Sequence, residues 1–192
     1  MSRVGKKPIL LPKEIKASRE GQALKIIGPK GELVLLISPE IEFSLADNQI
    51  VFSVNPKQDK EILTSKRRKG IQSLWGMNRN MVENLIEGVT KGYEKRLQID
   101  GLGYRAEVQD GDLVLSVGFS HPLRIKKIEG VTFVVEKNII VITGIQKDLI
   151  GQTAAKIRQL RAPDPYKGKG IRYLGEIIKK KAGKKAAGAV SK

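Results

Sequence analysis

Residues 21–51 read GQALKIIGPKGELVLLISPEIEFSLADNQIV, and residues 111–141 read GDLVLSVGFSHPLRIKKIEGVTFVVEKNIIV. Placed one above the other at an offset of 90 without a gap, they share an apolar pattern, turn positions and two phenylalanines. The matching pairs are Gly21 with Gly111, Ile27 with Val117, Gly28 with Gly118, Leu33 with Leu123, Leu35 with Ile125, Ile41 with Val131, Phe43 with Phe133, Leu45 with Val135, Asn48 with Asn138 and Val51 with Val141. We infer two copies of one unit of about 80–90 residues, a size that folds as a small domain.

Each copy is expected to contain strands followed by a helix. Apolar runs and turn residues predict strands at 24–26, 33–37, 41–45 and 50–54, and again at 97–99, 104–108, 113–117, 131–135 and 139–142. Apolar residues at helical spacing predict a helix from Ile150 to Leu160, and a longer one from Ile71 to Ile86 with an interruption near Gly76. The fold class is therefore α+β: two tandem copies, each a mostly antiparallel sheet covered by a helix.

These elements suggest three parts of the chain. Residues 1–82 form the first repeat domain, 83–175 the second, and 176–192 a basic, flexible tail. Trp75 lies on the apolar stripe of the long helix and is expected in the core. The segment from Val89 to Gly92 is expected to connect the copies.

The charge points to a polyanionic partner. The net charge is +16, and the residues from 151 onward carry twelve cations against two anions, a net +10. Such a balance favours nucleic acid first and an anionic membrane surface second. The second repeat domain and the tail are therefore the expected electrostatic footprint.

Other classes of protein find little support in the sequence. The chain has no cysteine and one histidine, His121, so we expect no metal site and no cofactor. Residues 1–12 lack the apolar core of a signal peptide, and no apolar run approaches a membrane span, so an intracellular protein is expected.

Two motifs could suggest catalysis or nucleotide binding. Residues 101–106, GLGYRA, fit a dinucleotide-binding pattern, but hairpin-like alternation follows where a helix is required, which favours glycines that bend a strand. Ser120 beside His121 lacks an activating third group and precedes Pro122, which favours a turn. We expect no catalytic residue and no enzymatic activity.

The segment 161–173, RAPDPYKGKGIRY, is the most informative for binding. Prolines stiffen it, glycines permit close backbone approach, and cations recur through it, as suits docking on phosphates; the alternative is an ordinary solvated basic loop. Aromatic residues make up only 5%, so recognition of phosphates and shape is expected in place of base stacking. The candidate RNA-binding residues are Lys156, Arg161, Tyr166, Lys167, Gly168, Lys169, Gly170, Arg172, Tyr173, Lys179 and Lys180.

At this segment the chain resembles the family of the sixth protein of the large ribosomal subunit, in its bacterial or organellar form. The resemblance covers about residues 1–178 and is carried by further motifs. These are Arg3, Pro8, Pro12, Asn80-Met81, Gly88-Val89-Thr90, Gly101 to Arg105, Gly118 to Pro122 and Gly151-Gln152.

The resemblance implies two duplicated domains and a structural role in translation without enzymatic activity or cofactor. It implies binding of 23S-type ribosomal RNA near the base of the factor-binding stalk and the sarcin–ricin loop, with neighbouring ribosomal proteins as further partners. It also implies a ribosome-bound protein of the cytoplasm, or of an organelle. The alternative is a free basic RNA- or DNA-binding or chaperone-like protein.

The lysine-rich tail should add affinity without specificity, because its lysines are flexible point charges. Deleting residues 179–192 is expected to weaken binding to ribosomal and random RNA alike and to flatten the salt dependence. Salt titrations with both RNAs measure this. Loss of discrimination between the two RNAs would contradict the prediction.

Overall fold

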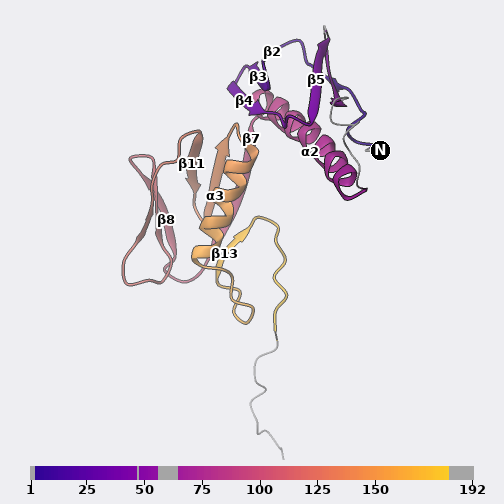
Figure 1. Ribbon diagram of the computed structural model, residues 1–192. Helices are drawn as coiled ribbons and strands as arrows, with labels where there is room; N and C mark the ends of the chain where they lie inside the picture. The colour runs from indigo at the N-terminus through magenta and orange to yellow at the C-terminus, as the bar shows by residue number, and fades with distance from the viewer. Residues whose placement is uncertain (1–2, 47, 56–64, 182–192) are drawn as a thin grey trace, which may run out of the picture. The chain divides into compact units, whose positions relative to one another are not determined.

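The computed structural model describes residues 3–46, 48–55 and 65–181, and it is α+β, as predicted (Figure 1). The chain divides into two compact units. The first comprises Met1–Tyr93 and Ile145–Lys147, and the second comprises Glu94–Gly144 and Asp148–Lys192. The predicted boundary after residue 82 falls inside the long helix α2, which runs to Thr90.

The first unit contains two three-stranded antiparallel sheets and α2. One sheet has the order β1-β6-β5 and the other β2-β3-β4. The elements are β1 (Ile9–Leu10), β2 (Lys16–Glu20), β3 (Ala23–Gly28), β4 (Gly31–Leu36), β5 (Ile41–Ala46), β6 (Gln49–Val54) and α2 (Ser65–Thr90). Helix α2 packs on strands of both sheets, so its apolar face closes the core of this unit.

Trp75 is part of that core, as predicted. Its side chain is buried, and its indole Nε1 donates a hydrogen bond to the Phe52 carbonyl oxygen over 3.0 Å. The expected interruption near Gly76 is wrong, because α2 is continuous. Burial of Ile71, Trp75, Val82 and other residues of the same stripe compensates for a glycine within the helix.

The second unit contains a three-stranded sheet of order β10-β9-β8, a four-stranded sheet of order β11-β12-β7-β13, and α3. Its elements are β7 (Tyr93–Asp100), β8 (Arg105–Gln109), β9 (Asp112–Ser116), β10 (Leu123–Ile125), β11 (Val131–Glu136), β12 (Ile139–Gly144), α3 (Lys147–Leu160) and β13 (Gly170–Tyr173). Helix α3 buries Ile150, Thr153, Ala154 and Ile157. The predicted bend at 101–103 is confirmed: the Tyr104 N–H donates to the Gly101 oxygen over 3.3 Å, and a strand follows in place of a helix.

One expectation about the C-terminal segment is wrong. Residues 163–173 are not a single docking loop, because Gly170–Tyr173 form β13, which pairs antiparallel with β7 from Leu97 to Asp100. The strand is short and its Ile171 is fully buried. Sequence periodicity cannot detect four residues whose stability comes from a distant partner strand.

The ungapped repeat is correct from β4 onward but wrong over the first hairpin. The turn at Gly21, with φ of 62°, corresponds to that at Asp110, with φ of 55°, which is an offset of 89. At the expected offset of 90, exposed Ile27 would match buried Val117. A shift of one residue reverses the faces of a strand, so the second copy has one additional residue between β9 and β10.

The separate cores predict that the units unfold independently. Trp75 is the one tryptophan and reports the first unit, whereas Ile142 is fully buried in the second. Replacing Ile142 by alanine should lower the free energy of unfolding of the second unit by about 2–5 kcal/mol. In a urea titration, the part of the far-ultraviolet circular dichroism transition that belongs to the second unit should move to lower urea concentration. The midpoint of the Trp75 fluorescence transition should stay unchanged.

The matched control is Phe43→Ala, which opens a cavity in the core of the first unit and should move the fluorescence midpoint. If Ile142→Ala moved both signals together, the two units would unfold as one.

Candidate nucleic-acid interface

The basic turn that joins α3 to β13, defined as residues 161–169, is held at both ends. The Ile171 N–H donates to the Arg161 carbonyl oxygen over 2.8 Å, and the Leu174 N–H donates to the Arg96 oxygen over 3.0 Å. Because β13 is also paired with β7, the basic turn runs between a helix and a strand that both have buried side chains.

Asp164 organises the interior of the basic turn. Its carboxylate accepts hydrogen bonds from the backbone N–H groups of Tyr166 at 3.1 Å and Lys167 at 3.2 Å. Its own N–H donates to the Lys169 oxygen, and its carbonyl accepts from the Gly168 N–H, both over 2.8 Å. An aspartate that bonds the backbone two and three residues later is a common device for stabilising a turn.

Gly170 permits a close approach between two backbone segments of the protein itself. A Cβ atom there would lie 2.6 Å from the Pro163 Cα and 2.8 Å from the Ala162 oxygen, and φ is 145°. These neighbours are backbone atoms that cannot move aside like a flexible side chain. Glycine at 170 therefore lets β13 pass against the start of the basic turn, and its role is structural.

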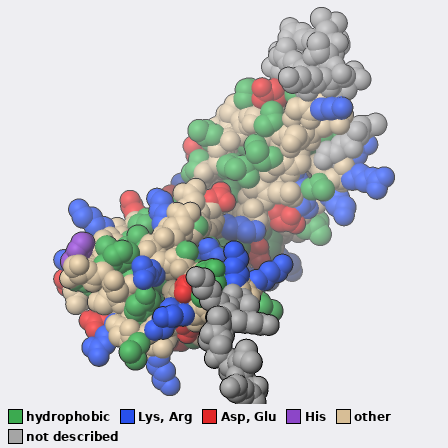
Figure 2. Space-filling view, turned by 90° about the horizontal axis from the view of Figure 1, so that it is seen from below, with side chains coloured by type: hydrophobic (Ala, Val, Ile, Leu, Met, Phe, Trp, Pro, Cys, Tyr) green, Lys and Arg blue, Asp and Glu red, His purple; other side chains and the backbone are tan. Residues whose placement is uncertain are grey.

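A cleft of about 650 Å³ opens beside the basic turn. Arg161, Lys167 and Lys169 are exposed and line it, together with the acidic residue Asp164. Leu102 and Tyr104 line it from the bend before β8. Figure 2 shows Lys and Arg side chains spread over the visible face of the second unit, the body that carries the histidine.

Other predicted RNA-binding residues lie outside the cleft. Arg172 on β13 forms an ion pair with Asp100 on β7 at 2.8 Å, and Tyr173 lies beneath the Arg158 guanidinium, 5.7 Å from its ring centroid. Lys156 on α3, Tyr166, Lys179 and Lys180 are exposed and do not line the cleft, and the half-buried Gly168 does not line it either. The structure therefore separates a convergent set of cations from residues that brace the strand.

Glu176 anchors the start of the predicted tail. Its carboxylate accepts hydrogen bonds from two nitrogens of Arg158, one at 3.1 Å, and from the Tyr173 N–H at 2.9 Å. Further along, the Lys181 N–H donates to the Pro165 oxygen over 3.0 Å. The part of the predicted tail from residue 182 onward lies outside the described residues.

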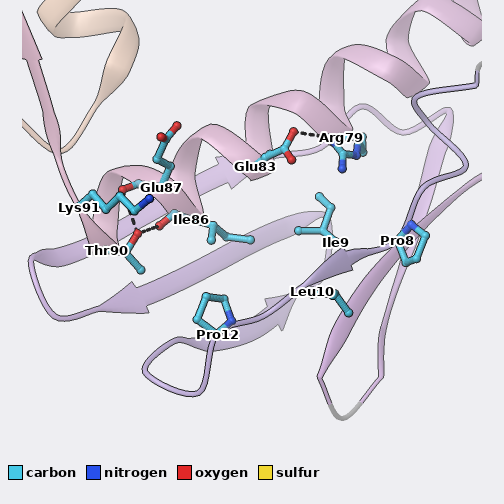
Figure 3. Close-up of a pocket in the computed structure, with 10 residues that line it drawn as sticks. All are labelled: Pro8, Ile9, Leu10, Pro12, Arg79, Glu83, Ile86, Glu87, Thr90 and Lys91. Carbon is cyan, nitrogen blue, oxygen red and sulfur yellow. Dashed lines mark hydrogen bonds and ion pairs between the residues drawn. The ribbon is translucent and has the colours of Figure 1, made fainter.

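A second cavity, of about 550 Å³, lies in the first unit between β1 and α2 (Figure 3). Its walls carry both charges: Arg79 and Glu83 form an ion pair, Glu87 follows on the same helix, and Lys91 comes directly after the helix ends. This mixture gives no net positive site, so the cleft of the second unit is the better candidate for a polyanion.

Comparison with known proteins identifies the family. A sequence profile of the family Ribosomal protein L6 matches residues 101–174. The Large ribosomal subunit protein uL6 of Trichodesmium erythraeum (strain IMS101) is 48% identical over 185 residues, which cover 96% of this chain and 98% of the relative. The chain belongs to the uL6 family. The relatives of the same name from Rhizobium rhizogenes (strain K84 / ATCC BAA-868) and Acaryochloris marina (strain MBIC 11017) are 47% and 44% identical, over 96% of this chain and 99% and 98% of theirs.

Membership of this family confirms the predicted resemblance and the expectation that the chain is not an enzyme, because the relatives are structural proteins of the ribosome. Within the described residues, no helix is long and apolar enough to cross a membrane. The same part of the chain holds no cluster of three or more side chains suited to a metal ion.

The Glu176 anchor predicts a pH dependence. Hydrogen bonds from Arg158 and from the Tyr173 backbone hold the pKa of Glu176 below its ordinary value of about 4.5. A carboxyl group whose pKa is lowered by folding stabilises the fold above its unfolded pKa and loses this effect as the pH falls through the folded value. Glu176→Gln should therefore reduce the acid-induced drop in melting temperature of the second unit.

Circular dichroism melting curves from neutral to acidic pH measure this, with the exposed Glu129→Gln as the matched control. A Glu176→Gln protein with the same acid dependence as wild type would mean that the anchor does not contribute to stability.

Proposed function

We propose that the chain binds large-subunit ribosomal RNA through the cleft of its second unit. The observation that carries this proposal is the convergence of Arg161, Lys167 and Lys169 on one cleft beside a turn that is fixed by hydrogen bonds. A backbone that is already fixed loses little conformational freedom on binding, and phosphate contacts supply most of the affinity of proteins for nucleic acids.

Family membership supports the choice of RNA. The relatives are named as proteins of the large ribosomal subunit, so ribosomal RNA and neighbouring ribosomal proteins are the partners we propose. Within that subunit, the proposed location is the base of the factor-binding stalk beside the sarcin–ricin loop of 23S-type RNA. The protein would then be bound to ribosomes in the cytoplasm or in an organelle.

The remaining basic residues have secondary roles in this proposal. Lys156, Lys179 and Lys180 are exposed and can add phosphate contacts around the cleft, whereas Arg172 and Tyr173 keep β13 in place. The alternative, a free basic nucleic-acid-binding protein, differs in one observable property. A ribosomal component co-sediments with large subunits through high salt, and a free binder does not.

A salt titration tests the cleft directly. Replacing Arg161, Lys167 and Lys169 together by alanine should remove up to three phosphate contacts. The slope of log affinity against log salt should then shrink by roughly 2–3, at about 0.9 for each duplex phosphate. The ligand is a fragment of large-subunit ribosomal RNA.

The matched control removes the same charge from the first unit, at the exposed Lys13, Lys16 and Lys30. Its slope should change less, because that unit lacks the C-terminal basic segment. If the cleft variant kept the wild-type slope, the cleft would face solvent or protein, and the site assignment would fail.

A further inference from the structure

The ring of Tyr104 packs closely against two glycines from separate turns. A Cβ atom at Gly101 would lie 2.5 Å from the Tyr104 Cδ2, and one at Gly118 would lie 3.2 Å from its Cε1. Gly118 also has a φ of 82°, a conformation that side chains rarely permit. The motifs at 101–104 and 118–119 therefore converge on one aromatic ring, although 13 residues lie between Tyr104 and Gly118.

Tyr104 in turn holds Arg161. The Arg161 Nε donates a hydrogen bond to the Tyr104 hydroxyl oxygen over 3.2 Å, and the guanidinium carbon lies 5.7 Å from the centroid of the Phe119 ring. No hydrogen bond joins the two terminal nitrogens of Arg161 to another described residue, and the side chain is exposed. These nitrogens form the planar fork that binds a phosphate in two places.

The rest of the cleft does not resemble a surface for duplex phosphates alone. Leu102 is 91% exposed at its edge, and the Asp164 carboxylate lies among the cations. A paired A-form helix offers phosphates and hydroxyl groups, but it keeps the faces of its bases stacked inside. A carboxylate repels a phosphate, whereas it accepts hydrogen bonds from the N–H groups on the edge of an unpaired base.

We propose that the cleft binds one unpaired nucleotide of folded RNA. Its phosphate lies on the terminal nitrogens of Arg161, with Lys167 and Lys169 beside it, and its base lies against Leu102 with an edge toward Asp164. Tyr104 and Phe119 are positioning residues that fix the Arg161 fork. This inference rests on the proposed function and specifies what the RNA must offer: a base that is out of the stack. The cleft volume of about 650 Å³ is within the range of 300–1,000 Å³ that is typical of small-ligand sites.

The test is chemical probing of every base in protein-free large-subunit ribosomal RNA, with and without the full chain. The wild-type chain should protect an unpaired base. Leu102→Ala should restore the reactivity of that base while leaving the salt slope unchanged, because no charge is lost. Since Leu102 is almost fully exposed, this variant should keep the wild-type melting temperature.

The positioning role has its own variant. Tyr104→Phe removes only the hydroxyl group that accepts from Arg161, and it should lower affinity by about 2- to 10-fold, with the same salt slope and melting temperature. Tyr93→Phe is the matched control: Tyr93 does not line the cleft and is not a candidate RNA-binding residue, so the change should leave affinity unaltered.

These experiments distinguish a failure of RNA binding from a failure of the nucleotide site. If the wild-type chain did not bind the RNA, the proposed function would fail. If it bound and the triple cleft variant lost salt slope, but Leu102→Ala left every base as protected as in the wild-type complex, RNA binding would stand. The cleft would then contact duplex phosphates only, and the nucleotide site would be overturned. Equal losses of affinity in Tyr104→Phe and Tyr93→Phe would overturn the positioning role.

Discussion

Backbone pairing between β13 and β7 is the constraint on which the candidate interface depends. Four residues, Gly170–Tyr173, add an edge strand to a sheet whose interior is buried. The basic turn at 161–169 is short. Helix α3 fixes its first residue and β13 fixes its last, so the backbone of the turn has little conformational freedom. Gly170 makes the pairing compatible with the turn, because a side chain at position 170 would have no room beside Pro163. The Arg172–Asp100 and Arg158–Glu176 ion pairs then brace the strand.

This arrangement explains how two similar units can have different roles. Both copies use the same alternation of buried side chains, for example Ile41 and Phe43 in β5 and Val131 and Phe133 in β11. The cations are concentrated instead in the segment that follows the helix of the second copy, where ten cations against two anions give a net charge of +8 of the total +16. In this account the shared fold supplies stability and the C-terminal addition supplies the polyanion site.

The sequence predicted the elements whose signal is local, and it missed those whose partners are distant. Alternation such as that of Val131 to Val135 marks a half-buried strand without knowledge of its neighbours. Strand β2 is nearly all exposed and reads KASRE, so it has no such signal. Composition singled out the cations at 156–180, but it could not separate Arg172, which pairs with Asp100, from Arg161, which faces the cleft. Tyr104 was missed because its role depends on glycines and an arginine that are distant in sequence.

The most direct test of the central claim is ultraviolet crosslinking of the full chain to large-subunit ribosomal RNA, with the crosslinked peptides mapped by mass spectrometry. Crosslinks should concentrate on residues 101–104 and 161–169, the two segments that meet at the cleft. Crosslinks confined to the first unit, or to the exposed face of the β8, β9 and β10 sheet, would contradict it.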